Sequence, residues 1–182
     1  PKACAHLHLP LQSGSDAVLR AMRRPYSSME FAAVVARIRA RMPFAGITTD
    51  LIVGFPGETD ELFVETLKFL EKMQFSRIHI FKFSPRDGTP AATMGGQIDN
   101  STKNRRSDEV EAVWQSSAQS FYQRFVGREL EVLWETSESG IIQGFSREYI
   151  PCFIAANDSM LNQITHVRGL GVTPQGLQVA EI

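Results

Sequence analysis

Residues 47–58, ITTDLIVGFPGE, constrain the fold most, because a run rich in β-branched residues ends abruptly in a turn with two glycines. Thr59, Asp60 and Glu61 follow at once, and such residues are typical of a helix N-terminus. A buried strand that leads through a tight turn into a helix is the unit from which parallel α/β sheets are built. Such folds bind ligands in the loops after the carboxyl ends of their strands, so the turn at 54–58 is a candidate site.

Strand-like and helix-like segments alternate through the first 125 residues. The predicted strands cover 5–11, 46–53 and 77–84, and the predicted helices cover 15–22, 27–42, 59–73 and 102–125. Ser15 is a candidate cap for the first helix, and Ser27 and Glu30 have the spacing of a capping box for the second. Helical crossovers predict a parallel sheet with right-handed connections. Three units are too few to close a barrel of about eight strands, so we expect a partial (β/α) barrel.

The pattern changes after Gly127, where helical periodicity disappears. Five β-rich runs, at 129–135, 140–145, 149–155, 164–167 and 177–182, are separated by glycines and polar clusters. Five short strands in so short a segment predict a small antiparallel barrel of OB-like size. We therefore expect an α/β fold in two domains, a partial βα barrel at 1–125 and a small β-barrel at 126–182.

Charge is distributed unevenly between these two parts. Residues 1–126 carry 16 Lys and Arg against 13 Asp and Glu, whereas residues 127–182 carry 3 against 7. Neither part has the basic excess of a non-specific nucleic-acid binder. Apolar runs fall short of the roughly 20 residues that span a bilayer, and the sequence shows no signal peptide, so we expect no membrane association.

Cysteine usage and the start of the chain add two expectations. Cys4 and Cys152 lie far apart without CxxC spacing, which predicts a cytoplasmic protein with no disulfide framework. The chain starts at Pro1 and enters strand-like sequence almost at once, so we expect a piece of a longer protein. We expect the open edge of its sheet to be covered by a second copy in a dimer, or by a segment exchanged between chains.

Polar side chains cluster after the first strand, at the same end of the sheet as the turn at 54–58. Gln12, Ser13 and Ser15 suit recognition of a carboxylate or a ribose, or they simply cap a helix. Arg23 and Arg24 lie just past that helix. One of them is expected to be solvated, and the other to clamp a carboxylate or phosphate in bidentate fashion.

The glycine turn also has two interpretations. In the structural one, Gly54 and Gly57 supply positive φ angles, Pro56 shapes the turn and Glu58 favours the helix N-terminus. In the functional one, the backbone of the turn holds a ligand. Asp50 lies in an otherwise buried strand and needs a partner, which is either a salt bridge or a ligand.

Two alternating patterns have further functional interpretations. His6 and His8 face the same side of one strand, but no third ligand is spaced to complete a metal site with them. Phe145, Arg147 and Tyr149 alternate in the small barrel. They are either core residues with a solvated arginine or a stacking platform for unpaired bases.

A resemblance to the radical-SAM methylthiotransferases rests on three motifs in this order: HLHLPLQSGSDAVLRAMRRPYS, TTDLIVGFPGETDELF and FKFSPRDGTPAATM. The C-terminal runs GRELEVLWE and GFSREYIPCF resemble that family's TRAM domain. The resemblance implies attachment of a methylthio group with S-adenosylmethionine and, in the full-length protein, two 4Fe-4S clusters. QSGS and SPRDGTP favour the tRNA-modifying branch. The stretch IHIFKFSPRDGTPAATMGGQ looks most like the subfamily that modifies carbon 2 of threonylcarbamoyladenosine beside the anticodon.

The resemblance also implies roles for individual residues. The residues near the methionyl and ribose parts of S-adenosylmethionine would be Gln12, Ser13, Ser15 and Arg24. Those that line the same mouth near the adenine would be Asp50, Gly54, Pro56, Gly57 and Glu58. Arg86 would lie on the rim that faces tRNA, and Arg147 and Tyr149 would contact the anticodon stem-loop from the small barrel.

The sequence departs from the family pattern in one important respect. It lacks the CxxxCxxC motif, and Cys4 and Cys152 cannot replace the three cysteines that hold a radical-SAM cluster. We therefore expect the chain to hold no cluster and to be inactive by itself. The alternatives are an isopentenyladenosine tRNA methylthiotransferase, a ribosomal-protein (aspartate) methylthiotransferase and a non-catalytic RNA-binding protein.

Overall fold

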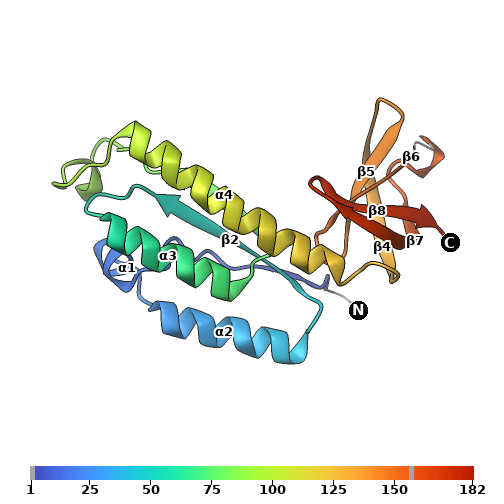
Figure 1. Ribbon diagram of the computed structural model, residues 1–182, viewed down its shortest axis with the longest axis horizontal. Helices are drawn as coiled ribbons and strands as arrows, with labels where there is room; N and C mark the ends of the chain where they lie inside the picture. The colour runs from blue at the N-terminus through green and yellow to red at the C-terminus, as the bar shows by residue number, and fades with distance from the viewer. Residues whose placement is uncertain (1–2, 156–157) are drawn as a thin grey trace.

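A computed structural model describes residues 3–155 and 158–182. Its N-terminal part contains a parallel three-stranded sheet in the order β1-β2-β3, formed by β1 (His6–His8), β2 (Gly46–Val53) and β3 (Arg77–Lys82) (Figure 1). The parallel sheet and its helical crossovers confirm the predicted βα units. The first strand is shorter than predicted, although Gln12 still forms an isolated bridge with Leu51.

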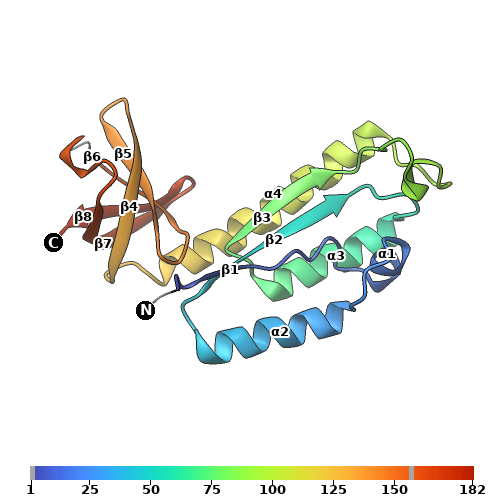
Figure 2. The same ribbon diagram turned by 180° about the vertical axis from the view of Figure 1, so that it is seen from behind.

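Helices connect these strands and cover one face of the sheet. They are α1 (Asp16–Ala21), α2 (Ser28–Arg41), α3 (Asp60–Met73) and α4 (Asn100–Gln123), with a short 3₁₀ turn, η1, at Pro90–Ala92. Figure 2 shows the sheet from the opposite side, with the strands in front of α3 and α4. None of the helices in the described ranges is long and apolar enough to cross a membrane.

Local sequence accounts for the helix starts, with one exception. Ser27 and Glu30 form the predicted capping box, Thr59 accepts a hydrogen bond from the Leu62 N–H, and Asp99 accepts one from the Thr102 N–H. The prediction that Ser15 caps α1 is wrong. Ser15 occupies the N-cap position, but its side chain makes no capping bond and instead donates to Glu65 Oε2 over 2.7 Å.

The core of the βα part lies between the sheet and the helices. It includes the following buried residues: Leu11, Val35, Ile47, Leu51, Val53, Phe63, Leu70, Phe75, Ile78 and Val110. The alternation along β2 assigns Ile47, Leu51 and Val53 to the helix-covered face, and leaves Asp50 on the other face. This alternation determines which polar side chains can face a ligand.

The C-terminal part forms a closed barrel in the order β4-β5-β6-β8-β7. Its strands are β4 (Glu129–Glu138), β5 (Ile141–Ser146), β6 (Pro151–Ala155), β7 (Ile164–Thr173) and β8 (Gly176–Glu181), with a 3₁₀ turn, η2, at Asp158–Met160. The closed five-stranded barrel confirms the predicted small TRAM-like fold. One pair, β6 with β8, is parallel, so the barrel is not antiparallel throughout.

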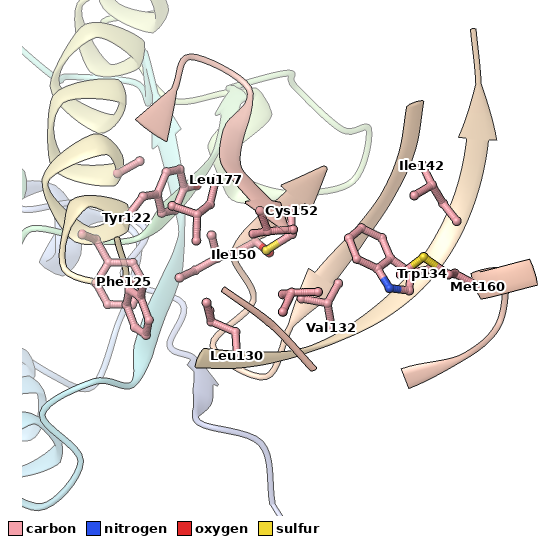
Figure 3. Close-up of a cluster of buried hydrophobic side chains, with 14 residues drawn as sticks. Tyr122, Phe125, Leu130, Val132, Trp134, Ile142, Ile150, Cys152, Met160 and Leu177 are labelled. Carbon is pink, nitrogen blue, oxygen red and sulfur yellow. The ribbon is translucent and has the colours of Figure 1, made fainter. Parts of the chain in front are cut away.

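The end of α4 joins the two parts physically. Phe121, Tyr122 and Phe125 belong to the barrel core together with the fully buried Trp134. Figure 3 shows Tyr122 and Phe125 in the same cluster as Ile150 and Leu177. The same helix supplies Val110 to the core of the sheet, so α4 anchors the barrel to the sheet through one continuous element.

Candidate cofactor-binding site

Polar groups converge where the strands of the sheet end. Gln12 has a φ of +70° and is tied to β2 on both sides, because its N–H donates to Asp50 O over 2.8 Å and its carbonyl accepts from Ile52 N–H over 2.9 Å. A cavity of about 410 Å³ opens beside it. The lining residues are Gln12, Asp50, Ile52, Phe81, Lys82, Phe83, Ser84, Arg86, Thr89 and Ala91.

A second hollow of about 470 Å³ adjoins the first, since both are lined by Ile52, Phe83, Thr89 and Ala91. Arg24 lines this second hollow, together with its neighbour Arg23. The fold therefore places Gln12, Asp50, Arg24 and Arg86 around one mouth, although they come from four separate segments of the chain. We call the two adjoining hollows the mouth.

Asp50 faces the mouth from the uncovered side of the sheet, where it has a histidine partner. His8 Nε2 lies 3.3 Å from Asp50 Oδ2, and His8 Nδ1 lies 3.0 Å from Thr48 Oγ1. His6 Nε2 contacts the same Thr48 hydroxyl over 2.9 Å. Burial, followed by the charge of His8, lowers the pKa of His6, which favours its neutral ring at neutral pH. This network holds the Asp50 carboxylate in place without using all of its acceptor sites.

Ser13 and Ser15 face away from the mouth, although sequence grouped them with Gln12. Ser13 Oγ lies 3.2 Å from Thr66 Oγ1 of α3 and accepts the Ser15 N–H over 3.2 Å. Both serines are buried, and the Ser15 hydroxyl is committed to Glu65. A Cβ on Gly14 would meet the Cβ of Phe69 at 2.8 Å, so the loop packs tightly on α3. These residues fix the loop that presents Gln12.

The turn at 54–58 is held by internal bonds. Gly54 has a φ of +74°, and its N–H donates to Glu58 Oε2 over 2.7 Å. Glu58 is only 1% exposed, so its carboxylate points into the protein rather than into the mouth. Pro56 is buried, whereas Gly57 is exposed and donates its N–H to Gly96 O over 2.9 Å. The turn is thereby attached to the loop that follows β3.

Glu58 is paired with an arginine that sequence reasoning missed. Arg106 Nη1 donates to Glu58 Oε2 over 2.9 Å and to the Glu58 carbonyl over 3.0 Å, while its Nη2 donates to the exposed Asp60 over 2.9 Å. Burial raises the pKa of Glu58, and the Gly54 N–H and Arg106 oppose that rise. One feature of the sequence could have indicated that Arg106 is buried. The buried face of α4 continues at helical spacing from Val110 back to Arg106 and Lys103.

The two candidates in the small barrel lie in the turn between β5 and β6, not on a strand. The strand predicted at 149–155 therefore begins later, at Pro151, because Tyr149 has a φ of +63° and lies in the turn that reverses the chain. Its ring lies between His6, with centroids 4.5 Å apart, and Phe145, 4.7 Å away. Arg147 donates to Glu131 over 2.6 Å and to the Ala3 carbonyl over 3.2 Å.

The cysteines do not fit an iron–sulfur cluster. Across residues 3–155 and 158–182, no group of three His, Cys, Asp or Glu side chains is arranged to hold a metal ion. Cys4 is exposed, whereas Cys152 is buried in the barrel core, where burial raises its pKa to about 12. A cluster needs thiolates that converge on it, and these two cysteines do not supply them.

Comparison with known proteins agrees with this architecture. Residues 2–70 match the Radical SAM superfamily. A threonylcarbamoyladenosine tRNA methylthiotransferase of Thermotoga maritima is 44% identical over 82% of the chain, and one of Bacillus subtilis is 36% identical over 92%. A tRNA-2-methylthio-N(6)-dimethylallyladenosine synthase of Frankia alni is 49% identical over 73% of the chain. The chain spans 35%, 38% and 27% of these three relatives, respectively.

The βα sheet with its polar mouth, together with the superfamily match, defines the N-terminal part as a segment of a radical-SAM domain. The relatives over most of the chain are methylthiotransferases, and the closed barrel corresponds to a TRAM-like barrel. The chain belongs to the radical-SAM methylthiotransferase family.

Proposed function

We propose that the chain is the part of a tRNA methylthiotransferase that presents S-adenosylmethionine and RNA to each other. The observation that carries this proposal is the mouth, where Gln12, Asp50, Arg24 and Arg86 meet at the strand ends. The proposed product carries a methylthio group on carbon 2 of threonylcarbamoyladenosine next to the anticodon. Relatives with that specificity in their names align with 82% and 92% of the chain and support this choice.

Each residue around the mouth has a proposed task toward the cofactor. When bound, S-adenosylmethionine supplies the methyl group and the radical precursor. Arg24 pairs with its carboxylate, since a guanidinium matches a carboxylate in bidentate fashion. The Gln12 amide and the Asp50 carboxylate bind ribose or amino groups, because both have acceptors directed at the cavity. Gly54, Pro56 and Gly57 form the backbone wall near the adenine.

The remaining candidates act in support of these contacts. Ser13 and Ser15 lock the Gln12 loop onto α3, and Glu58 locks the turn through Arg106. On the RNA side, Arg86 lines the mouth and is the proposed contact to the anticodon stem-loop. Arg147 and Tyr149 are assigned chiefly to holding the barrel on the sheet, since Tyr149 has rings stacked on it from both His6 and Phe145.

A second candidate is the modification of dimethylallyladenosine, because relatives of that specificity reach 49% identity over 73% of the chain. Nucleoside mass spectrometry of tRNA from a strain lacking the gene separates the two candidates. We expect loss of the methylthio form of threonylcarbamoyladenosine and its return when the intact gene is restored. Loss of the methylthio dimethylallyl nucleoside instead would transfer the assignment to the second candidate, and an unchanged nucleoside profile would refute both.

A further inference from the structure

A small pocket of about 160 Å³ lies at the opposite end of the sheet from the mouth. It opens beside the start of β2, and its polar lining comes from α2, from α4 with its C-cap Arg124, and from the segment between α3 and β3. The lining residues that matter are Arg39, Gln74, Ser76, Ser117, Ser120 and Arg124. In Figure 1 the C-terminal ends of α2, α3 and α4 lie at the same end of the sheet, and α4 continues to the small barrel.

Two guanidinium groups are fixed in this pocket by backbone carbonyls. Arg39 Nη2 donates to the carbonyls of Met73 and, over 3.0 Å, Gln74, at the end of α3. Arg124 Nη2 donates to the Pro43 carbonyl, and its guanidinium lies 5.0 Å from the ring centroid of Phe44. Among the hydrogen bonds of the described residues, each of these arginines uses only its Nη2, so the Nε and Nη1 donors of each stay available to a ligand.

The pocket has positive charge without a counterion. Within the described ranges, no ion pair includes Arg39 or Arg124, or Arg128, whose guanidinium lies 4.3 Å from the same Phe44 ring. Burial, followed by the charge of Arg124, lowers the pKa of Arg39. Two cations held close enough to repel one another are stabilised when an anion binds between them.

Neutral donors complete the lining. The hydroxyls of Ser117 and Ser120 have no hydrogen-bond partner within the part of the chain that the structure describes, and Ser117 is only 8% exposed. Guanidinium groups and hydroxyls are the donors that proteins present to the several acceptor oxygens of a phosphate. The pocket is several times smaller than the mouth, so it suits one phosphate group rather than a nucleoside.

We propose that Arg39, Arg124, Ser117 and Ser120 bind a phosphate group of the RNA backbone. This inference rests on the proposed function for the identity of the RNA. The pocket contacts the chain at Ala45 and Ile47, and the mouth contacts it at Asp50 and Ile52, so about five residues of β2, roughly 17 Å, separate their centres. The bound phosphate therefore belongs to the flanking RNA, several nucleotides from the one that enters the mouth, and it determines how the stem lies across the protein.

The test measures the affinity of an anticodon stem-loop RNA for the intact protein over a range of KCl concentrations. The variants are Arg39→Gln with Arg124→Gln, and separately Ser117→Ala with Ser120→Ala, which leaves both guanidinium anchors in place. Loss of one phosphate contact should lower the slope of log K against log salt by about 0.7–0.9 in the arginine variant. The serine variant should weaken RNA binding severalfold, while binding of S-adenosylmethionine stays unchanged in both.

Arg41→Gln is the matched control, because Arg41 lies in the last turn of the same helix and carries the same charge but does not line the pocket. An equal slope change in this control would overturn the proposal, as would unchanged slopes in the arginine variant of a protein that still binds RNA. A protein that binds no RNA before mutation would overturn the proposed function as well. Inorganic phosphate that shifts the arginine Nε resonances, without any effect of the variants on RNA affinity, would assign the pocket to free phosphate and refute the RNA contact.

Discussion

The buried pair between Glu58 and Arg106 gives the sharpest prediction about how the turn below the mouth is held. Their side chains are 1% and 3% exposed, and Arg106 Nη1 lies 2.9 Å from Glu58 Oε2. Arg106→Met leaves a buried carboxylate with the Gly54 N–H but without its cation. Removal of one partner of a buried pair costs about 3–5 kcal/mol. At about 2–4 °C per kcal/mol for a chain of this size, the melting temperature should fall by roughly 6–20 °C.

Urea unfolding monitored by circular dichroism measures this loss, and two further variants make it specific. Arg105→Met is the matched control, because Arg105 pairs with Asp60 and Glu109 at the surface, with its side chain 51% exposed. Exposed pairs contribute little, so this variant should unfold within about 1 kcal/mol of the unmodified chain. Glu58→Gln combined with Arg106→Met removes both charges and should recover a large part of the lost stability.

The effect should also depend on pH, with a definite sign. Burial raises the pKa of Glu58 in the folded chain, and loss of Arg106 removes a group that opposes this rise. The folded state then binds a proton more tightly than the unfolded state. Protonation of Glu58 therefore stabilises the folded chain fully at pH values below the pKa that Glu58 has in the unfolded chain. This stabilisation is lost as the pH rises through the pKa that Glu58 has in the folded chain. The cost of Arg106→Met should therefore shrink as pH falls from 7 to 5. An Arg106→Met variant no less stable than Arg105→Met would refute the reasoning.

Three further predictions concern the turn, the barrel junction and the chain alone. Gly54→Ala should cost about 1–2 kcal/mol in urea unfolding, because φ is +74° there and a Cβ would lie 2.4 Å from Lys103 Cγ; an unchanged midpoint contradicts this. Tyr149→Ala removes two stacked contacts, each contributing about 0.5–1.5 kcal/mol, and should speed amide exchange at the junction, whereas Tyr149→Phe should not. The chain reconstituted alone with iron and sulfide should form no 5′-deoxyadenosine from S-adenosylmethionine; turnover would show that we have misread its cysteines.

Local patterns predicted those parts of the fold that local physics determines. The strand at 46–53 and the capping box at Ser27 appear as predicted, because alternation and capping depend on near neighbours. The sequence also predicted that Gln12 and Asp50 lie near the same mouth, because parallel strands bring their carboxyl ends to the same edge of the sheet.

Side-chain direction after the strands could not be predicted in the same way. Ser13 and Ser15 follow Gln12 directly, yet they turn toward α3 because Thr66 and Glu65 offer partners there. Tyr149 was predicted to begin a strand, but its φ is positive and it lies in a turn. Its ring stacks on His6, which belongs to the distant first strand. Such contacts join residues that are far apart in the sequence, so a periodic pattern of hydrophobic residues does not predict them.

Calorimetric titration of the intact protein with S-adenosylmethionine tests most directly whether the mouth binds this cofactor through Arg24 and Gln12, as we propose. Arg24→Ala should weaken binding at least tenfold, since a charge-assisted hydrogen bond contributes about 1.5–3 kcal/mol. Arg20→Ala is the control, because Arg20 lies on the neighbouring helix α1 but does not line the mouth. An Arg24→Ala dissociation constant equal to that of the Arg20→Ala control would contradict the assignment of the mouth.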